Sequence, residues 1–247
     1  MSARRERLAA ISLAAALLAA LLPEVALALA GQVTHVSGAV IARGPTGQTR
    51  ILSLRSEVNE GDLIVTSENT YVRIKFTDGG DVVLRPNTQL KIDTYSYQES
   101  TPSGDGLAMS LLKGGLRSVT GLLGRRNPGA YKLNTATATV GIRGTHFGAL
   151  VCNNDCAGVL APGGRPPANG LHVDVSDGVI VVTTRAGSTE FRIGDFGFVP
   201  SQNAMPVLVP QNQGTRVNVP QQMVTRSEQS VQGGGVGRAQ DNECTIR

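Results

Sequence analysis

The sequence predicts an all-β protein in which antiparallel hairpins stack as a sandwich or a short solenoid. Apolar and polar residues alternate with a period of two along several segments, most clearly between Gly61 and Ile92. Glycine, proline and asparagine clusters separate these segments, and no stretch after residue 30 keeps a helical period for more than a turn or two. Alternation broken by frequent turn residues is typical of strands that bury one face.

The segment 61–92 predicts three consecutive strands. Apolar side chains occupy every second position from Val72 to Phe76, and a glycine-containing turn follows at residues 78–80. Such a turn joins two antiparallel strands, so residues 82–84 form the return strand. A third strand begins after the turn at Pro86. A hairpin leaves one apolar face bare, and we therefore expect further strands to cover it.

The remaining strands follow from the same alternation. Two strands precede the hairpin within residues 31–54, and a final hairpin spans 173–193. Residues 107–119 contain two adjacent glycines, which disfavour a helix interior by about 1 kcal/mol each, so strands with a turn or bulge are expected there. Polar, turn-rich compositions predict exposed loops at 96–106, 121–129 and 157–170.

Threonines and small residues distinguish the segment 131–151, which alternates throughout. Gly141, Gly144 and Gly148 interrupt it, and glycines inside a strand indicate bending or close backbone approach. At Gly144 we expect a side chain to strain the backbone or to block packing.

A faint internal repeat supports stacked hairpins. Residues 36–40 and the later pair Gly61-Asp62 resemble residues 175–179 and the later pair Gly194-Asp195. Each copy predicts a strand, a turn and a second strand that ends in Gly-Asp.

The first 30 residues have the features of a cleaved signal peptide. Arg4, Arg5 and Arg7 form a positive start, residues 8–22 are apolar, and residues 28–30 read Ala-Leu-Ala, a typical cleavage signature. A membrane anchor is disfavoured because a span needs about 20 apolar residues and Pro23 interrupts the run. Ordinary secretion fits better than the twin-arginine route. We expect the mature chain in the periplasm or secreted, with no membrane span left after cleavage.

The rest of the chain divides into a β domain at 31–200 and a tail at 201–247. The tail is rich in Gln, Asn, Ser and Gly, and we expect it to be flexible or loosely docked.

Three cysteines in an exported chain suggest a disulfide bond. Cys152 and Cys156 enclose a turn-forming Asn-Asn-Asp trio, so their sulfurs could close a tight loop. A metal site would need two more ligands nearby, and none stands at a useful spacing. Cys244 remains, either free or available to a partner thiol.

No pattern of catalytic, metal-binding or cofactor-binding residues emerges, so we expect no enzyme and no cofactor. His35, His146 and His172 are far apart and favour structural hydrogen-bonding roles. The Asp-Gly-Gly-Asp run at 78–81 matches no calcium loop, and no serine lies in a nucleophile elbow. Paired carboxylates of a glycoside hydrolase stay open, because their separation depends on the fold.

The charge balance argues against nucleic-acid binding. The formal net charge is only +4, and it is spread along the chain. The one basic run lacks aromatic partners and is interpreted as a solvated strand face plus a loop; it comprises Lys113, Arg117, Arg125 and Arg126.

Five motifs in order resemble the FecR family. They are residues 36–40 (VSGAV), 60–66 (EGDLIVT), 76–80 (FTDGG), 84–88 (LRPNT), and 133–135 (LNT) with 140–147 (VGIRGTHF). The residues that carry the likeness most directly are Gly38, Gly61, Asp62, Asp78, Gly79, Gly141, Arg143, Gly144, Thr145 and Phe147.

The FecR resemblance implies a periplasmic all-β module that relays a signal by protein contact. In the best-known members the signal passes from an outer-membrane siderophore transporter to a cytoplasmic sigma factor. This sequence starts with a cleavable signal instead of a cytoplasmic segment, so control of a sigma factor is not expected. The resemblance implies a non-enzymatic protein-binding or signalling module of the cell envelope with an envelope protein as partner. A structural scaffold is the alternative, and an unrecognised hydrolase is the third.

Overall fold

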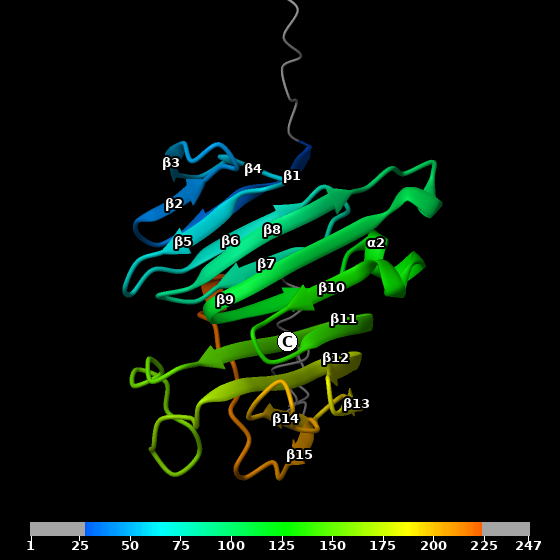
Figure 1. Ribbon diagram of the computed structural model, residues 1–247. Helices are drawn as coiled ribbons and strands as arrows, with labels where there is room; N and C mark the ends of the chain where they lie inside the picture. Colours follow the sequence, from blue (N-terminus) through cyan, green and yellow to red (C-terminus); the bar gives the residue numbers. More distant parts are fainter. Residues whose placement is uncertain (1–27, 224–247) are drawn as a thin grey trace, which may run out of the picture.

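The computed structural model describes residues 28–223, which form an all-β protein (Figure 1). The predicted fold class is thereby confirmed. Hydrogen bonds link the fifteen strands of these residues into one continuous open sheet. The sheet folds over itself because three long strands bend and contribute one half to each of two layers. These strands are β9 (Gly106–Val119), β11 (Thr139–Cys152) and β12 (Gly170–Thr184).

The first layer has the order β3-β2-β5-β8-β9-β10-β11-β12-β13. It uses the first halves of β9 and β11 and the second half of β12. All neighbours are antiparallel except β9 and β10. The remaining members are β2 (Val40–Arg43), β3 (Thr49–Leu52), β5 (Leu63–Thr66), β8 (Gln89–Ser96), β10 (Tyr131–Asn134) and β13 (Gly187–Arg192).

The second layer has the order β4-β1-β6-β7-β9-β11-β12-β14-β15, and all its neighbours are antiparallel. It uses the other halves of the three long strands. Its remaining members are β1 (Leu29–Val36), β4 (Glu57–Asn59), β6 (Val72–Phe76), β7 (Asp81–Leu84), β14 (Phe196–Val199) and β15 (Val207–Val209).

One apolar core fills the space between the layers. The rings of Phe76 and Tyr95, from opposite layers, stack with centroids 5.6 Å apart. Tyr131 and Phe147 meet edge to face in the same way at 6.4 Å. The predicted hairpin is present as β6 and β7, and its alternate residues from Val72 to Phe76 are buried in this core. The alternation in the sequence therefore corresponds to the face of β6 that points into the core.

Glycines set the bends of the long strands. Gly114, Gly144 and Gly178 have φ values of +77°, +59° and +73°, a region that side chains disfavour. A Cβ at Gly178 would collide with the carbonyl oxygen of Gly144, whereas a Cβ at Gly144 would meet nothing within 4 Å. The constraint at Gly144 is thus backbone strain and not packing. Residues 107–119, expected as separate strands, form the single bent strand β9.

The loop predicted at 121–129 is wrong in part, because a short helix lies there. This helix is α2 (Leu122–Arg126), and the 3-10 turn η2 (Pro128–Ala130) follows it. Two backbone N–H groups at its start bond to Asp78, one to its carbonyl at 3.0 Å and one to its carboxylate at 3.1 Å. A contact so distant in sequence stabilises the helix start without any local periodicity. Further 3-10 turns are η1 (Pro102–Gly104) and η3 (Gln221–Met223).

The Gly-Asp pairs of the internal repeat form two equivalent turns. Asp62 accepts the N–H of Asn59 on its carboxylate at 2.7 Å, and Asp195 accepts that of Arg192 at the same distance. The preceding glycines have φ values of +84° and +87°. Each turn connects a strand of one layer to a strand of the other, so the sequence repeat corresponds to two crossings between the layers.

Residues just outside the predicted domain of residues 31–200 also pack against the sheet. Strand β1 begins at Leu29, and Ala30 is fully buried. The first part of the tail packs on the second layer, where Thr215 and Val217 are buried. Most of the expected signal peptide, the rest of the tail and Cys244 lie outside the described residues. Between residues 28 and 223, no helix has the length and apolar character needed to cross a membrane.

Candidate functional site

A polar pocket of about 240 Å³ lies at the corner where β9 bends. The turn between β7 and β8, the loop before β6 and the disulfide loop after β11 surround it. Its charged lining residues are Glu68, Arg85, Lys113 and Asp155. Its other polar lining residues include Asn69, Tyr71 and Asn87. Four segments distant in sequence thus bring both signs of charge to one cavity.

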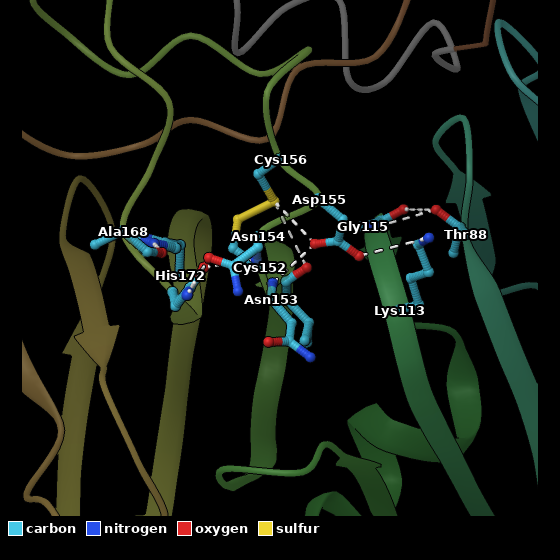
Figure 2. The surroundings of a disulfide bond; sticks show 12 residues. Thr88, Lys113, Gly115, Cys152, Asn153, Asn154, Asp155, Cys156, Ala168 and His172 are labelled. Atoms are coloured by element: carbon cyan, nitrogen blue, oxygen red, sulfur yellow. Dashed lines mark hydrogen bonds and ion pairs between the residues drawn. A yellow bond between two sulfur atoms is a disulfide. The ribbon is translucent and has the colours of Figure 1, made fainter.

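The disulfide loop forms one wall of the pocket. Cys152 and Cys156 are bonded, with Cα atoms 5.4 Å apart, as their spacing predicts. Figure 2 shows Asp155, inside this loop, facing Lys113 of β9; their charged atoms are 3.6 Å apart. Asp155 also accepts the N–H of Asn153 at 2.8 Å. The disulfide therefore closes the loop at the end of β11, and the ion pair with Lys113 connects the loop to β9.

Hydrogen bonds hold the floor of the pocket. The Thr88 hydroxyl donates to the Gly115 carbonyl and accepts the Gly115 N–H, both at 3.0 Å (Figure 2). The Arg85 N–H donates to the same carbonyl at 2.9 Å. These bonds fix the Leu-Arg-Pro-Asn-Thr motif against the bend of β9. Because these bonds hold the backbone of the motif in place, the Arg85 side chain extends from a fixed position.

A second polar centre lies under the docked end of the chain. Arg117 pairs with Asp174, and both side chains are at most 3% exposed. Arg117 also donates to Ser176 at 2.7 Å and to the Val217 carbonyl at 3.0 Å, and it contacts His146 at 3.1 Å. The interpretation of the basic run as a solvated face is wrong for Arg117, since burial and ionic pairing replace water around it.

The FecR-motif residues do not converge on one site. Gly61 and Asp62 form the first repeated turn, Gly38 lies in the bend before β2, and Phe147 is fully buried in the core. Gly141 and Arg143 lie on β11 and line a shallow groove on the first layer. These residues shape turns, the core and a surface strand, so they serve mainly the architecture.

A second group of motif residues meets at the corner beside α2. Asp78 is buried, and its carboxylate accepts the N–H of Gly80 at 2.9 Å. Burial raises the pKa of Asp78, while the backbone hydrogen bonds oppose that rise. Thr145 reaches the same corner and donates to the Val179 carbonyl at 2.6 Å. This corner joins the β6–β7 turn to the bend of β11 next to Gly144.

Two of the histidines have the structural surroundings that the sequence suggests. His172 lies near the disulfide loop, and its ring N–H donates to the Ala168 carbonyl at 2.8 Å (Figure 2). Burial lowers the pKa of His172, although this hydrogen bond works in the opposite direction. His146 contacts Arg117 as described above. Within residues 28–223, no three His, Cys, Asp or Glu side chains come together as a metal site.

Sequence reasoning missed the pocket. Arg85 belongs to a motif that predicts only a turn, and Lys113 belongs to a basic run that indicates a solvated face. The approach of Asp155 to Lys113 depends on pairing between β9 and β11, which no local pattern reveals. The one available signal was the pair Gly114-Gly115, because adjacent glycines in a strand mark close approach or bending.

A comparison with known protein families gives one match to part of the chain. Residues 62–161 match the family model described as FecR protein. This part of the chain belongs to the FecR family. The FecR match covers the β6–β7 hairpin, the LRPNT turn, β9 to β11 and the disulfide loop. It therefore includes every residue that lines the pocket.

Solved structures with similarity to this chain include one described as a cell surface anchoring domain. It is 31% identical, and the match covers 25% of this chain and 80% of that one with a TM-score of 0.24. Two crystal structures of a candidate anti-sigma factor from Parabacteroides distasonis are 14% identical, with TM-scores of 0.44 and 0.45. Those matches cover 61% of this chain and 60% of the other. No curated protein matches the chain.

Proposed function

We propose that the chain is exported to the periplasm or secreted, and that it works there as a non-enzymatic protein-binding or signalling module of the cell envelope. The observation that carries this proposal is the FecR match over residues 62–161. The positive start, apolar run and Ala-Leu-Ala signature of the first 30 residues support export.

The open edges of the sheet support recognition by protein contact. Within the described residues, β3 pairs only with β2 and β15 only with β14. Ile51 on β3 is 79% exposed, and Leu208 on β15 is 59% exposed. An edge strand offers unpaired backbone N–H and C=O groups, to which a partner can add a strand, and exposed apolar side chains strengthen that contact.

Cell fractionation with N-terminal sequencing tests export. We expect a processed chain in the periplasmic fraction or the medium, beginning close to the start of β1 at Leu29. An unprocessed chain that stays in the cytosol would contradict the proposal.

Site-specific photo-crosslinking tests protein contact. A photoreactive amino acid replaces Ile51 or Leu208 at the edges, and the control replaces Lys91, which lies in the middle of the first layer with its side chain 48% exposed. We expect a discrete, saturable product from at least one edge position and none from the control. Equal labelling at all three positions, or products only with bulk envelope material, would favour the structural scaffold instead.

A further inference from the structure

Arg85 differs from the other arginines that line the interior or its margins. Arg73 and Arg117 are buried and pair with Asp81 and Asp174. The half-buried Arg85 forms no side-chain hydrogen bond or ion pair among the described residues, and its Nε is buried without a partner. A buried donor left without a partner destabilises the fold, and more so when the group is charged. Because Arg85 lines the polar pocket, its unsatisfied group lies beside a cavity that a ligand can enter.

Arg85 is the cation of the pocket lining that has no ion-pair partner among the described residues. Lys113 has one, because the carboxylate of Asp155 lies 3.6 Å from its ammonium group. Glu68 lies exposed on the rim, and no ion pair joins it to Arg85. An anion that enters the pocket therefore meets one guanidinium that is already stripped of part of its water and has no competing carboxylate bound to it. Charge-assisted bonds to such a group are stronger than neutral ones.

Glycines give the Arg85 side chain its position. A Cβ added at Gly115 would lie 3.4 Å from Arg85 Cδ, so the stem of the arginine crosses directly over this glycine. A Cβ at Gly114 would lie 2.5 Å from the Thr88 hydroxyl oxygen. Gly115 thus leaves room for the arginine stem, and Gly114 leaves room for the turn that carries it. A guanidinium held from a rigid base loses little entropy on binding.

We propose that this pocket binds a single carboxylate group, with Arg85 as its ionic partner. The planar guanidinium matches a carboxylate in a two-point contact, and Asn69, Asn87 and Tyr71 can supply further hydrogen bonds from the lining. A doubly charged phosphate fits less well, because the carboxylates of Glu68 and Asp155 would repel its second charge. The volume of about 240 Å³ accommodates an acidic side chain or a small carboxylic acid.

This inference goes beyond the proposed function and does not depend on export, because its test uses the purified chain. Backbone amide NMR shifts of Gly114 and Gly115 report binding at low ionic strength. The probes are a glutamate-centred capped tripeptide, its glutamine counterpart, free glutarate and inorganic phosphate. We expect saturable shifts with the glutamate peptide or glutarate at Kd values on the order of 1–10 mM, and none with the glutamine peptide.

The relative affinities of these probes show where the bound carboxylate comes from and whether the pocket prefers a carboxylate to phosphate. Tighter binding of the peptide than of glutarate assigns the carboxylate to a protein partner, whereas tighter binding of glutarate assigns it to a small metabolite. Phosphate binding as tight as that of the carboxylates would overturn the assignment, and so would an absence of shifts with every probe.

Arginine variants test the role of Arg85. Arg85→Met keeps the apolar stem but removes the charge, and we expect affinity to fall at least roughly tenfold. The matched control is Arg43→Met at an exposed position on β2, which should bind like the unchanged protein. Arg85→Lys retains charge without the planar fork and should bind with intermediate affinity. An Arg85→Met variant that binds normally would refute the proposal, and Arg85→Lys provides the comparison if Arg85→Met fails to fold.

Discussion

Replacing Asp174 by asparagine probes the buried centre beneath the docked chain end. One Asp174 carboxylate oxygen accepts from Arg117, and the other accepts the Val217 N–H at 2.9 Å. Asparagine has nearly the same shape but only one acceptor oxygen. Its NH2 group must therefore face one of two donors, either the guanidinium or the backbone N–H. The substitution also leaves Arg117 buried without a compensating carboxylate.

The magnitude follows from the burial of the pair. Both side chains are at most 3% exposed, and removing one partner of a buried ion pair costs about 3–5 kcal/mol. For a domain of this size the cost corresponds to a fall in Tm of roughly 6–20 °C. Urea unfolding and calorimetry measure both quantities. The loss should also expose the segment around Val217 to limited proteolysis, since one of its anchoring bonds depends on Asp174.

The control is the same chemical change in an exposed pair. Glu190 and Arg192 on β13 lie 2.7 Å apart, but their side chains are 43% and 73% exposed. Glu190→Gln should change the free energy of unfolding by no more than about 0.5 kcal/mol, because water screens exposed pairs. Equal and small effects of Asp174→Asn and Glu190→Gln would show that the buried pair does not stabilise the fold in the way described.

Three further predictions concern the bend, the disulfide and pH. Gly144→Val should destabilise the protein by about 1–3 kcal/mol through its φ of +59°, with Gly144→Asn less costly; an unchanged Tm would contradict the strain. Cys152→Ser should cost about 2 kcal/mol, measured by urea unfolding, because it opens a short loop closed by Cys156. Burial lowers the pKa of His172, so the folded state favours its neutral form. The free energy of unfolding should therefore decrease as the pH falls below about 6.5, the pKa of an unperturbed histidine. His172→Gln should remove this part of the dependence of stability on pH.

Local sequence was sufficient to predict those strands and turns whose stabilising contacts are close in the chain. The hairpin of β6 and β7 shows why: alternate positions from Val72 to Phe76 are buried, and the turn residues at 78–80 need only their own backbone preferences. The Gly61-Asp62 and Gly194-Asp195 turns were likewise visible as a repeat, because each is stabilised by a carboxylate that bonds three residues back. Interactions that span a few residues leave readable patterns.

Long-range contacts account for what the sequence did not reveal. Arg117 reaches Val217 across 100 residues, and Asp78 bonds to the start of α2 across 45. Nothing near either residue signals the partner. The pocket has the same origin, because pairing between β9 and β11 carries the disulfide loop to Lys113 and Gly115. Charged residues in a strand can therefore be solvated, ion-paired or part of a site, and the sheet register decides among these.

The distribution of paired and unpaired groups separates architecture from recognition in this fold. Arg73 and Arg117 are satisfied by aspartates; the first pair joins the neighbouring strands β6 and β7, and the second lies beneath the docked chain end, so the loss of either must lower stability. Arg85 has no such partner, and removing its unsatisfied Nε relieves a cost while the apolar stem still covers Gly115. Arg85→Met should therefore leave Tm unchanged or raise it while weakening carboxylate binding. A residue whose removal costs binding but not stability is retained for what it contacts outside the fold.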